Sequence, residues 1–291
     1  ANLRALAREF QKAKEIAGGN GLFGVNIMVA SAIYKEYCDT AVAAGADAII
    51  SGAGLPLKLP QSTKGSNTLC APIVSSGRAA ALLCKTYDRQ FGVIPDFLVL
   101  EGYKAGGHLG FKKEDLLNGT AKENDALLAE VFTAIAPYEE KYGKKIPVFV
   151  AGGVFDGKDM AHFMKLGAAG VQIATRFIAT QECDAADGFK QMIIQAKEED
   201  IHIIQSPVGM PARAIESPLL ARLRAGEKYP ALHCNLCLSA CPKGLKTPYC
   251  ISRALVAAAE GDQENGLFFC GENASRVNEM TTVPELMQSI I

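Results

Sequence analysis

Short apolar runs and helical patterns alternate along the chain. The apolar runs of strand length are residues 22–29, 47–51, 71–76, 97–102, 146–153 and 169–175. The first residues form an amphipathic helical pattern that ends at Gly18-Gly19, a good C-terminal stop. Further helical patterns lie near 31–44, 77–90, 122–142, 157–167 and 184–199. The order therefore predicts repeated βα units.

The apolar runs lack the polar alternation of a strand with one solvated face. Such strands are buried on both sides, as in a parallel sheet covered by helices. This predicts an α/β fold, either a (β/α) barrel or a doubly wound sheet. A TIM (β/α)8 barrel needs eight strands and only six runs are visible. Because the sequence opens on a helix, we expect its first two βα units to be absent.

The alternation of apolar runs and helical patterns ends at about Val208. The prolines that interrupt this part of the chain are Pro207, Pro211, Pro218, Pro230, Pro242 and Pro248. A helix near 249–260 and a closing amphipathic helix from about Pro284 follow. We therefore predict a small inserted domain at 209–265 and a barrel domain made of 1–208 and 266–291.

Composition narrows the class of protein. The 291 residues include 30 Lys and Arg against 31 Asp and Glu, a balance that lacks the basic footprint of nucleic-acid binders. No apolar run reaches the ~18 residues of a membrane span. Nine cysteines without a visible signal peptide favour a reducing cytoplasm. Of these, Cys38, Cys70, Cys84 and Cys183 lie alone in apolar surroundings and are interpreted as inert core thiols.

Three strand ends carry loops of unusual composition, residues 101–111, 151–154 and 172–177. The glycines of the first two loops let the backbone approach a flat or phosphorylated ligand closely. At the carboxyl ends of consecutive barrel strands they would form one mouth, where active sites lie and where backbone N–H groups bind phosphate. His108 adds an ionisable ring, and Arg176 either adds charge to this site or pairs on the surface.

The motifs GVNIMV, SGAGLP, PIVSSGRAA, EG…AGGHLG, PVFVAGG, GVQIATRF and SPVGMPARAI follow one another over nearly the whole chain. In this order they resemble the nitronate monooxygenase family, formerly called 2-nitropropane dioxygenases. The same architecture includes FMN-dependent enoyl-ACP reductases. Family members begin with two βα units, the first with a Gly-Gly-Met flavin loop, and this sequence lacks both. The resemblance implies an FMN-binding TIM barrel with a small domain over its mouth.

The resemblance also implies roles for single residues. Asn26 would contact the flavin ring, and Gly106 and Gly107 would pass beside it. The residues that would hold the FMN phosphate are Gly152, Gly153, Gln172, Ile173, Ala174 and Thr175. The family usually has Gly where Ala174 stands. His108 matches the active-site histidine of the family.

Proton transfer is the chemistry expected of His108, since its ring titrates near neutrality. It would remove a proton beside a nitro group or donate one to an enoyl substrate. Glu101, counted with the cofactor site, would orient His108 or cap a helix. Ser75, Ser76 and Arg78 would touch flavin or substrate, or serve as an N-cap and a surface charge.

Four cysteines cluster in HCNLCLSACPKGLKTPYC with the spacing C-x2-C-x3-C-x8-C: Cys234, Cys237, Cys241 and Cys250. Four thiolates in so short a loop match a Zn2+ site or a [4Fe-4S] cluster. The proline after Cys241 is found in ferredoxin runs as well. The first three spacings are similar to those of dienoyl-CoA reductases related to old yellow enzyme, whose last gap is longer. The usual nitronate monooxygenases lack such a cluster, and inert thiols stay an alternative. His233 is a further candidate ligand.

These features lead to three functional hypotheses. The first is an FMN-dependent oxidoreductase that oxidises alkyl nitronates with O2. The second is an NAD(P)H-dependent FMN reductase of enoyl-ACP or other enoyl thioesters. The third is a non-catalytic protein that binds flavin or metal. The expected partners are a small-molecule or acyl-thioester substrate, with a homodimer as an open alternative to a monomer, and neither nucleic acid nor membrane.

Overall fold

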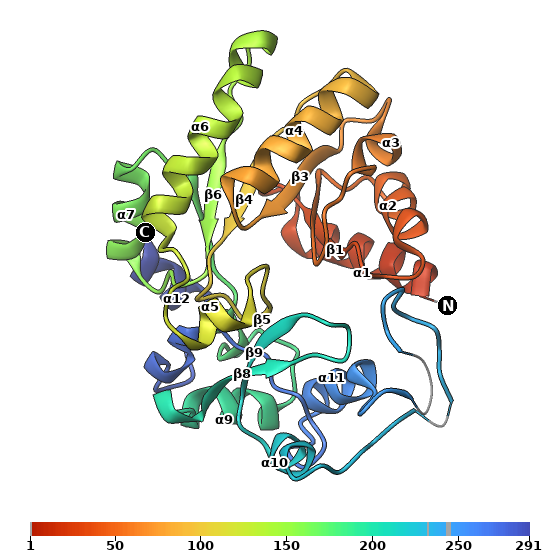
Figure 1. The fold of residues 1–291 in the computed structure, drawn as a ribbon, viewed down its shortest axis with the longest axis vertical. Helices are drawn as coiled ribbons and strands as arrows, with labels where there is room; N and C mark the ends of the chain where they lie inside the picture. The colour runs from red at the N-terminus through yellow and green to blue at the C-terminus, as the bar shows by residue number, and fades with distance from the viewer. Residues whose placement is uncertain (1, 232, 243–245) are drawn as a thin grey trace. The chain divides into compact units, whose positions relative to one another are not determined.

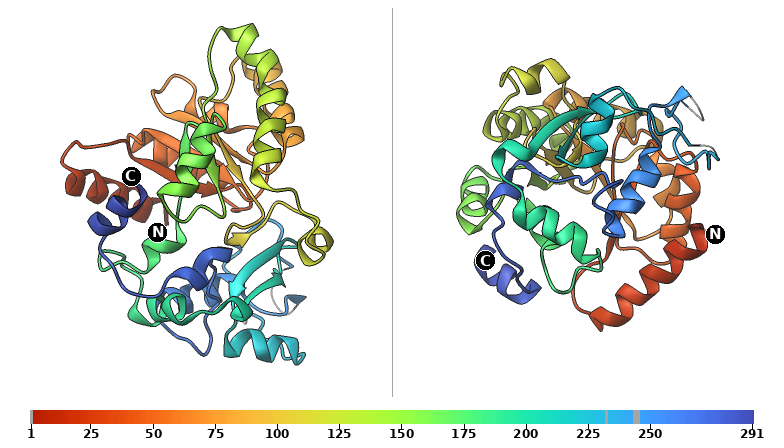
Figure 2. Two further views of the ribbon diagram at one scale, coloured as in Figure 1. Left: turned by 90° about the vertical axis from the view of Figure 1, so that its left-hand side faces the viewer. Right: turned by 90° about the horizontal axis from the view of Figure 1, so that it is seen from below.

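The computed structural model describes residues 2–231, 233–242 and 246–291. The chain divides into two compact units. The first unit consists of residues 1–100 and 124–149, and the second of residues 101–123 and 150–291. Figures 1 and 2 show the elements of both in chain-order colours. None of the described helices is long and apolar enough to cross a bilayer.

The main sheet has six strands that are neighbours in the order β1-β2-β3-β4-β6-β7. Their bounds are β1 Gly24–Met28, β2 Ala48–Gly52, β3 Leu69–Val74, β4 Leu98–Glu101, β6 Val148–Ala151 and β7 Gly170–Gln172. The first four pair in parallel, β1 with β2, β2 with β3 and β3 with β4. The six predicted apolar runs thus correspond to the six strands of this sheet, with ends that differ by one to three residues.

Helices of the first unit follow the strands as the pattern predicts. They are α1 Asn2–Ala17, α2 Tyr34–Ala43, α3 Leu59–Thr63, α4 Gly77–Phe91 and α6 Asn124–Tyr142. The helices α4 and α6 lie side by side (Figure 1), joined at one end by an ion pair between Lys141 and Asp88. The side chain of Ser76 accepts a hydrogen bond from the amide of Ala79, so Ser76 is the N-cap of α4.

The isolated cysteines of the first unit behave as predicted. Cys38, Cys70 and Cys84 are buried, with at most 4% of their surface exposed. Burial raises the pKa of Cys38 to about 11 and the pKa of both Cys70 and Cys84 to about 12. Since the thiolate is the reactive form, these side chains act as small apolar core residues.

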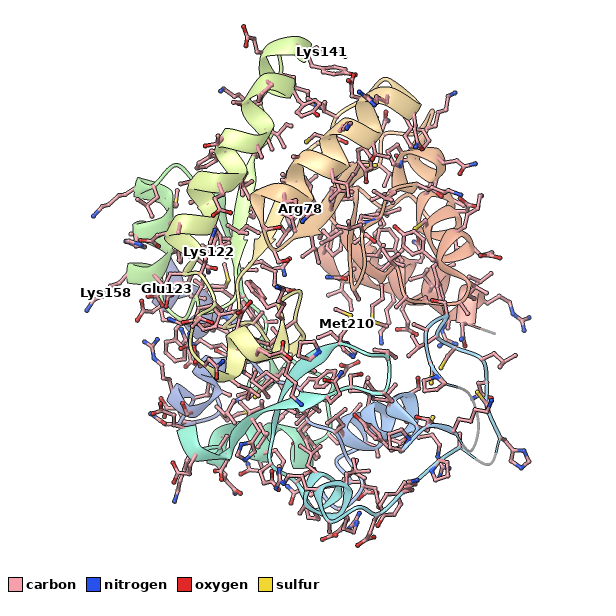
Figure 3. All side chains as sticks on the ribbon, viewed as in Figure 1. Arg78, Lys122, Glu123, Lys141, Lys158 and Met210 are labelled. Atoms are coloured by element: carbon pink, nitrogen blue, oxygen red, sulfur yellow. The ribbon has the colours of Figure 1, made fainter. Side chains whose placement is uncertain are left out.

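The second unit contains a small antiparallel sheet that the sequence analysis did not predict. Its strands are neighbours in the order β5-β9-β8, with β5 Gly107–His108, β9 Pro211–Ile215 and β8 Ile201–Gln205. Met210 lies at the turn between β8 and β9 (Figure 3). Every residue of β9 is buried, so both of its faces are packed.

Two clusters of apolar side chains cover the opposite faces of β9. Ile215 packs in a cluster with Ile193 and Phe268, and Ala214 packs in another with Leu219 and Tyr249. Neighbouring residues of a strand point to opposite faces, which explains this division. The helices of this unit are α5 Lys113–Leu117, α7 Gly157–Lys165, α8 Thr175–Ile178, α9 Asp187–Gln195, α10 Pro218–Arg224, α11 Ile251–Ala259 and α12 Val283–Ile290.

The two compact units divide the chain differently from the predicted domains, and the inserted domain stays a prediction. The residues predicted as an inserted domain, 209–265, share one unit with 266–291 and with the end of the predicted barrel segment. The reason is packing: the cluster around Ala214 also includes Leu267, and β9 pairs with β8 across the boundary at 209. The core of this part therefore extends past both predicted limits.

Candidate functional site

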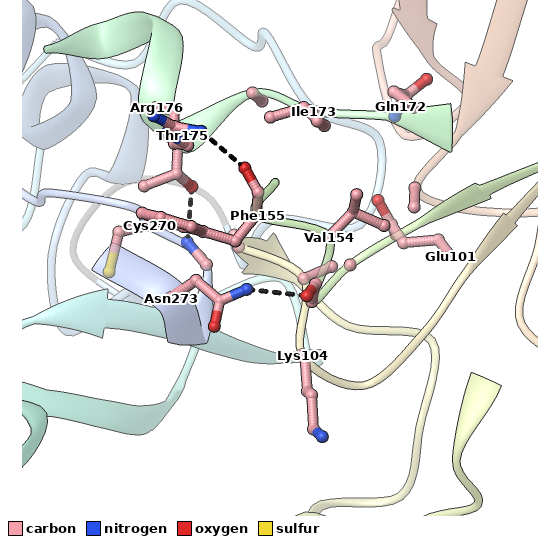
Figure 4. Close-up of a pocket in the computed structure, with 18 of the residues that line it drawn as sticks. Glu101, Lys104, Val154, Phe155, Gln172, Ile173, Thr175, Arg176, Cys270 and Asn273 are labelled. Atoms are coloured by element: carbon pink, nitrogen blue, oxygen red, sulfur yellow. Dashed lines mark hydrogen bonds between the residues drawn. The ribbon is translucent and has the colours of Figure 1, made fainter. Parts of the chain in front are cut away.

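A pocket of about 290 Å3 lies in the second unit. Its wall comes from four stretches of chain, 101–107, 151–155, 172–178 and 269–273 (Figure 4). The predicted cofactor residues that line it are Glu101, Gly106, Gly107, Gly152, Gly153, Gln172, Ile173, Ala174 and Thr175. The two glycine loops and the loop of residues 172–177, far apart in the sequence, thus meet in one cavity.

Close backbone packing explains two of these glycines. At Gly152 the backbone has φ +82°, and a Cβ would lie 2.8 Å from the carbonyl oxygen of Gly102 and 2.9 Å from the amide nitrogen of Ala105. At Gly106 a Cβ would lie 2.5 Å from the carbonyl carbon of Cys270. Both contacts are shorter than any side chain permits, so these glycines let the segments of the wall touch.

Hydrogen bonds tie residues 269–273 to the other loops (Figure 4). The side chain of Asn273 donates to the carbonyl oxygen of Gly153 at 2.7 Å. The amide of Gly271 donates to Oγ1 of Thr175 at 2.9 Å. The sequence analysis did not single out this stretch. Its signal is a glycine that directly follows the apolar run Leu267–Cys270, as in the predicted loops.

Arg213 binds the backbone of the first glycine loop through two hydrogen bonds. Only 6% of its surface is exposed. Its Nη1 donates to the carbonyl oxygen of Tyr103 at 2.6 Å and to that of Ala105 at 2.7 Å. The register of β9 places Arg213 opposite Gly107, which brings the guanidinium to this loop. A buried cation therefore fixes the backbone that leads into the pocket.

His108 lies directly beside the pocket. Its neighbour Gly107 lines the wall, and its ring packs edge-on against Phe269, another lining residue, at 5.3 Å between centroids. Its Nε2 lies 2.8 Å from Oγ of Ser206. Burial lowers the pKa of His108 below its usual value, so the ring is neutral at pH 7. A neutral imidazole is able to accept a proton.

Glu101 lines the pocket at the end of β4. Burial raises the pKa of its carboxyl group to about 7. The sequence analysis suggested that Glu101 orients His108, but the hydrogen bond of the His108 ring goes to Ser206. Glu101 is therefore a second titratable group of the pocket in its own right.

Two basic side chains line the same pocket. The guanidinium of Arg176 lies 4.3 Å from the centre of the Phe155 ring and donates to the carbonyl oxygen of that residue at 2.8 Å. Lys104 forms an ion pair with Glu123 at 3.2 Å. Arg176 also donates to Oγ of Ser289 at 3.2 Å, and its role toward a ligand stays a prediction.

The remaining predicted flavin contacts belong to the first unit. Asn26 is exposed on β1. Ser76 caps α4, and Arg78 follows in the first turn of that helix (Figure 3). The N-cap reading of Ser76 is confirmed, and the flavin contact of Asn26 stays a prediction.

The four clustered cysteines line a second pocket, of about 340 Å3. Cys234 and Cys237 are exposed, whereas Cys241 and Cys250 are half-buried. His233 lines this pocket as well. Within residues 2–231, 233–242 and 246–291, no three Cys, His or acidic side chains converge as a preformed site for one metal ion. The predicted metal centre is taken up below as a proposal.

The nitronate monooxygenase family model matches residues 2–291. A probable nitronate monooxygenase of Staphylococcus saprophyticus is 33% identical over 128 residues, 44% of this chain and 34% of that protein. The (3aS,4S,5R,7aS)-5-hydroxy-7a-methyl-1-oxo-octahydro-1H-indene-4-carboxyl-CoA dehydrogenase of Mycobacterium tuberculosis is 32% identical over 133 residues, 46% of this chain and 33% of that protein. The chain thus aligns with about a third of the length of these relatives.

Two solved structures resemble the fold. FabK from Thermotoga maritima gives a TM-score of 0.77 at 24% identity, covering 99% of this chain and 80% of that chain. Nitroalkane oxidase from Streptomyces ansochromogenes gives 0.71 at 18% identity, covering 98% and 84%. These matches confirm the predicted α/β class and its barrel-type arrangement of strands and helices. The two further βα units stay a prediction.

Proposed function

The chain belongs to the nitronate monooxygenase family, and we propose on this basis that it is an FMN-dependent oxidoreductase that oxidises alkyl nitronates with O2. One observation carries the proposal: the two glycine loops, residues 172–178 and residues 269–273 line a single pocket with His108 directly beside it. A concave pocket with convergent titratable groups is the expected form of such a site.

The pocket fits a flat, phosphorylated cofactor. Its lining includes glycines and other small residues from three loops, and glycine at position 152 lets two segments of the wall approach each other. Lys104 and Arg176 bring positive charge toward a phosphate. Gly153 and Thr175 would hold that phosphate, and Gly107 would lie beside the ring, as the family resemblance implies. When bound, FMN supplies a centre that accepts or donates a hydride or an electron.

Residues of this chain would carry out the proton transfer. Burial lowers the pKa of His108 and favours its neutral form, so it can take the proton from the carbon beside the nitro group of a neutral nitroalkane and thereby form the nitronate. Ser206 fixes the orientation of the ring through the 2.8 Å hydrogen bond to Nε2. The glycine loop that Arg213 binds places His108 at the edge of the pocket.

A second candidate is reduction of enoyl thioesters with NAD(P)H. The observation that favours it is the 32% identity to a dehydrogenase of a carboxyl-CoA thioester. In that reaction His108 would donate a proton to the substrate rather than accept one. A third candidate, a flavin- or metal-binding protein without catalysis, would leave the bound flavin inert toward both substrates.

The test begins with FMN. Added FMN should remain with the protein on desalting, with FAD retained less well, and preference for FAD would contradict the cofactor. The holoprotein is then mixed without oxygen with NADH or with a nitronate, and the flavin absorbance is followed. Bleaching by the nitronate but not by NADH supports the first candidate. The reverse supports the reductase, and no response to either supports the third candidate.

A histidine variant tests the chemistry. His108→Ala should keep FMN but lose turnover of a neutral nitroalkane, which needs the base, by on the order of 10²-fold. The matched control is His202→Ala, because His202 is partly exposed and pairs with Glu216 at 3.3 Å rather than lying beside the pocket. Turnover of the His108 variant equal to that of the His202 variant would remove His108 from the mechanism.

A further inference from the structure

The segment between α10 and α11 brings four thiols around one cavity. Cys234, Cys237, Cys241 and Cys250 all line the pocket of about 340 Å3. The wall between them is largely apolar, with Leu236, Leu238, Ile251 and Val256. Thiolates are soft ligands that select zinc or iron–sulfur clusters among biological metal centres. The cavity therefore has the ligand set of a metal centre and the space for more than one atom.

This segment has little else to hold its fold. Among its described residues, the regular pairing is limited to isolated bridges, such as the one between Tyr229 and Tyr249. Its buried apolar side chains include Ala231, Leu238 and Tyr249. Where a segment buries so little, metal–thiolate bonds supply the missing folding free energy. The four cysteines are the groups able to supply it here.

We propose that Cys234, Cys237, Cys241 and Cys250 bind one [4Fe-4S] cluster in this cavity. A single zinc ion needs four sulfurs at about 2.3 Å from one point. The thiols here surround a cavity of about 340 Å3, which suits a cluster that places one iron at each thiolate. Pro242 directly follows Cys241, as a proline follows a ligating cysteine in bacterial ferredoxins.

The cavity is joined to the rest of the unit through a helix. One basic and one acidic side chain, Arg253 and Glu260, line it beside the thiols. Cys250 is the residue before α11, so a metal bond to its sulfur would anchor the start of that helix. The helix in turn is joined to the wall of the first pocket, because the amide of Leu267 donates to the carbonyl oxygen of Ala254 at 2.9 Å, two residues before Phe269.

The site is independent of the proposed flavin chemistry, because all four ligands come from residues 234–250. The test is anaerobic reconstitution of the full chain with ferrous iron and sulfide, followed by removal of unbound iron. About four iron and four sulfide per chain are expected. Reduction with dithionite should then give the electron paramagnetic resonance signal of a reduced cluster. One zinc per chain in place of iron would overturn the proposal, as would four freely titratable thiols in protein that takes up no iron.

Two cysteine variants make the assignment specific. Cys237→Ser should lower iron and sulfide severalfold, whereas Cys183→Ser should leave both unchanged. Cys183 is a matched control, since it is half-buried in the same unit and lies outside the cavity. If the Cys237 variant fails to fold, the resonance signal of the unaltered chain still decides. Equal iron content in both variants would contradict ligation by this group of cysteines.

Discussion

Nε2 of His108 lies 2.8 Å from Oγ of Ser206, and 98 positions of sequence separate the two residues. The position of Ser206 is set by burial and by hydrogen bonds within its own turn. Only 2% of its surface is exposed, its amide donates to the carbonyl oxygen of Met210 at 2.9 Å, and its own carbonyl oxygen accepts from Gly209 at 3.0 Å. The turn between β8 and β9 therefore holds the hydroxyl that orients the proposed proton-transfer group.

The variant Ser206→Ala should reduce kcat with the best substrate by about three- to tenfold, the value of one hydrogen bond. FMN affinity and KM should stay near those of the unaltered protein, because Ser206 positions the ring and is not a lining residue of the flavin pocket. Stopped-flow kinetics and an FMN titration would separate the two effects. Ser66→Ala, in the first unit, is the control. Loss of FMN affinity in step with kcat would show a general structural role.

Much of the pocket could be predicted from the sequence, because its residues lie close in sequence to the ends of predicted strands. Gly106, Gly152 and Thr175 each follow a strand of the main sheet within a few residues. In parallel strands the carboxyl ends share one edge, so loops recognised one at a time come together once the order of strands is known. All the predicted cofactor residues of the second unit line the cavity for this reason.

Ser206 and Arg213 could not be found in this way. Both act through the antiparallel pairing of β5, β8 and β9, which joins residues about a hundred positions apart. Pro211 at the start of β9 argued for a break in structure, although a proline is tolerated at the first position of a strand.

Glu101 predicts a dependence of stability on pH. Its pKa is raised to about 7 in the folded chain, against 4.5 when exposed. The folded state therefore binds the proton more tightly, and the stability this contributes is complete below pH 4.5 and is lost as the pH rises through 7. Glu101→Gln should remove the loss, raising the free energy of unfolding of the apoprotein by about 1–3 kcal/mol at pH 8.

Urea unfolding at pH 4.5 and pH 8 measures this change. Near pH 4.5 the variant and the unaltered chain should differ by less than about 1 kcal/mol, since the carboxyl is then protonated in the folded state. Glu123→Gln is the control, because the carboxylate of Glu123 is largely exposed. An equal gain at both pH values would place the effect elsewhere than in the ionisation of Glu101.

The buried hydrogen bonds of Arg213 predict a link between the stability of the fold and FMN binding. Arg213→Met keeps the length of the side chain but removes the donor shared by the carbonyl oxygens of Tyr103 and Ala105. An unsatisfied buried polar group costs about 1–3 kcal/mol, and FMN affinity should fall with the displaced loop. Denaturant unfolding and an FMN titration measure both. Arg222→Met should cost less, because the partners of Arg222 are exposed. Unchanged FMN affinity would mean that the loop keeps its shape without this cation.

Gly152 tests whether contact between backbones shapes the pocket. Gly152→Ala places a Cβ 2.8 Å from the carbonyl oxygen of Gly102 at φ +82°. Gly209→Ala is a matched control with φ +86° and nothing within 4 Å of its Cβ. Both variants carry the cost of a left-handed alanine, about 1–2 kcal/mol. The collision should cost Gly152→Ala about 1–3 kcal/mol more and weaken FMN retention on desalting. Equal losses of stability in the two variants, with FMN retained by both, would show that the wall yields to a methyl group.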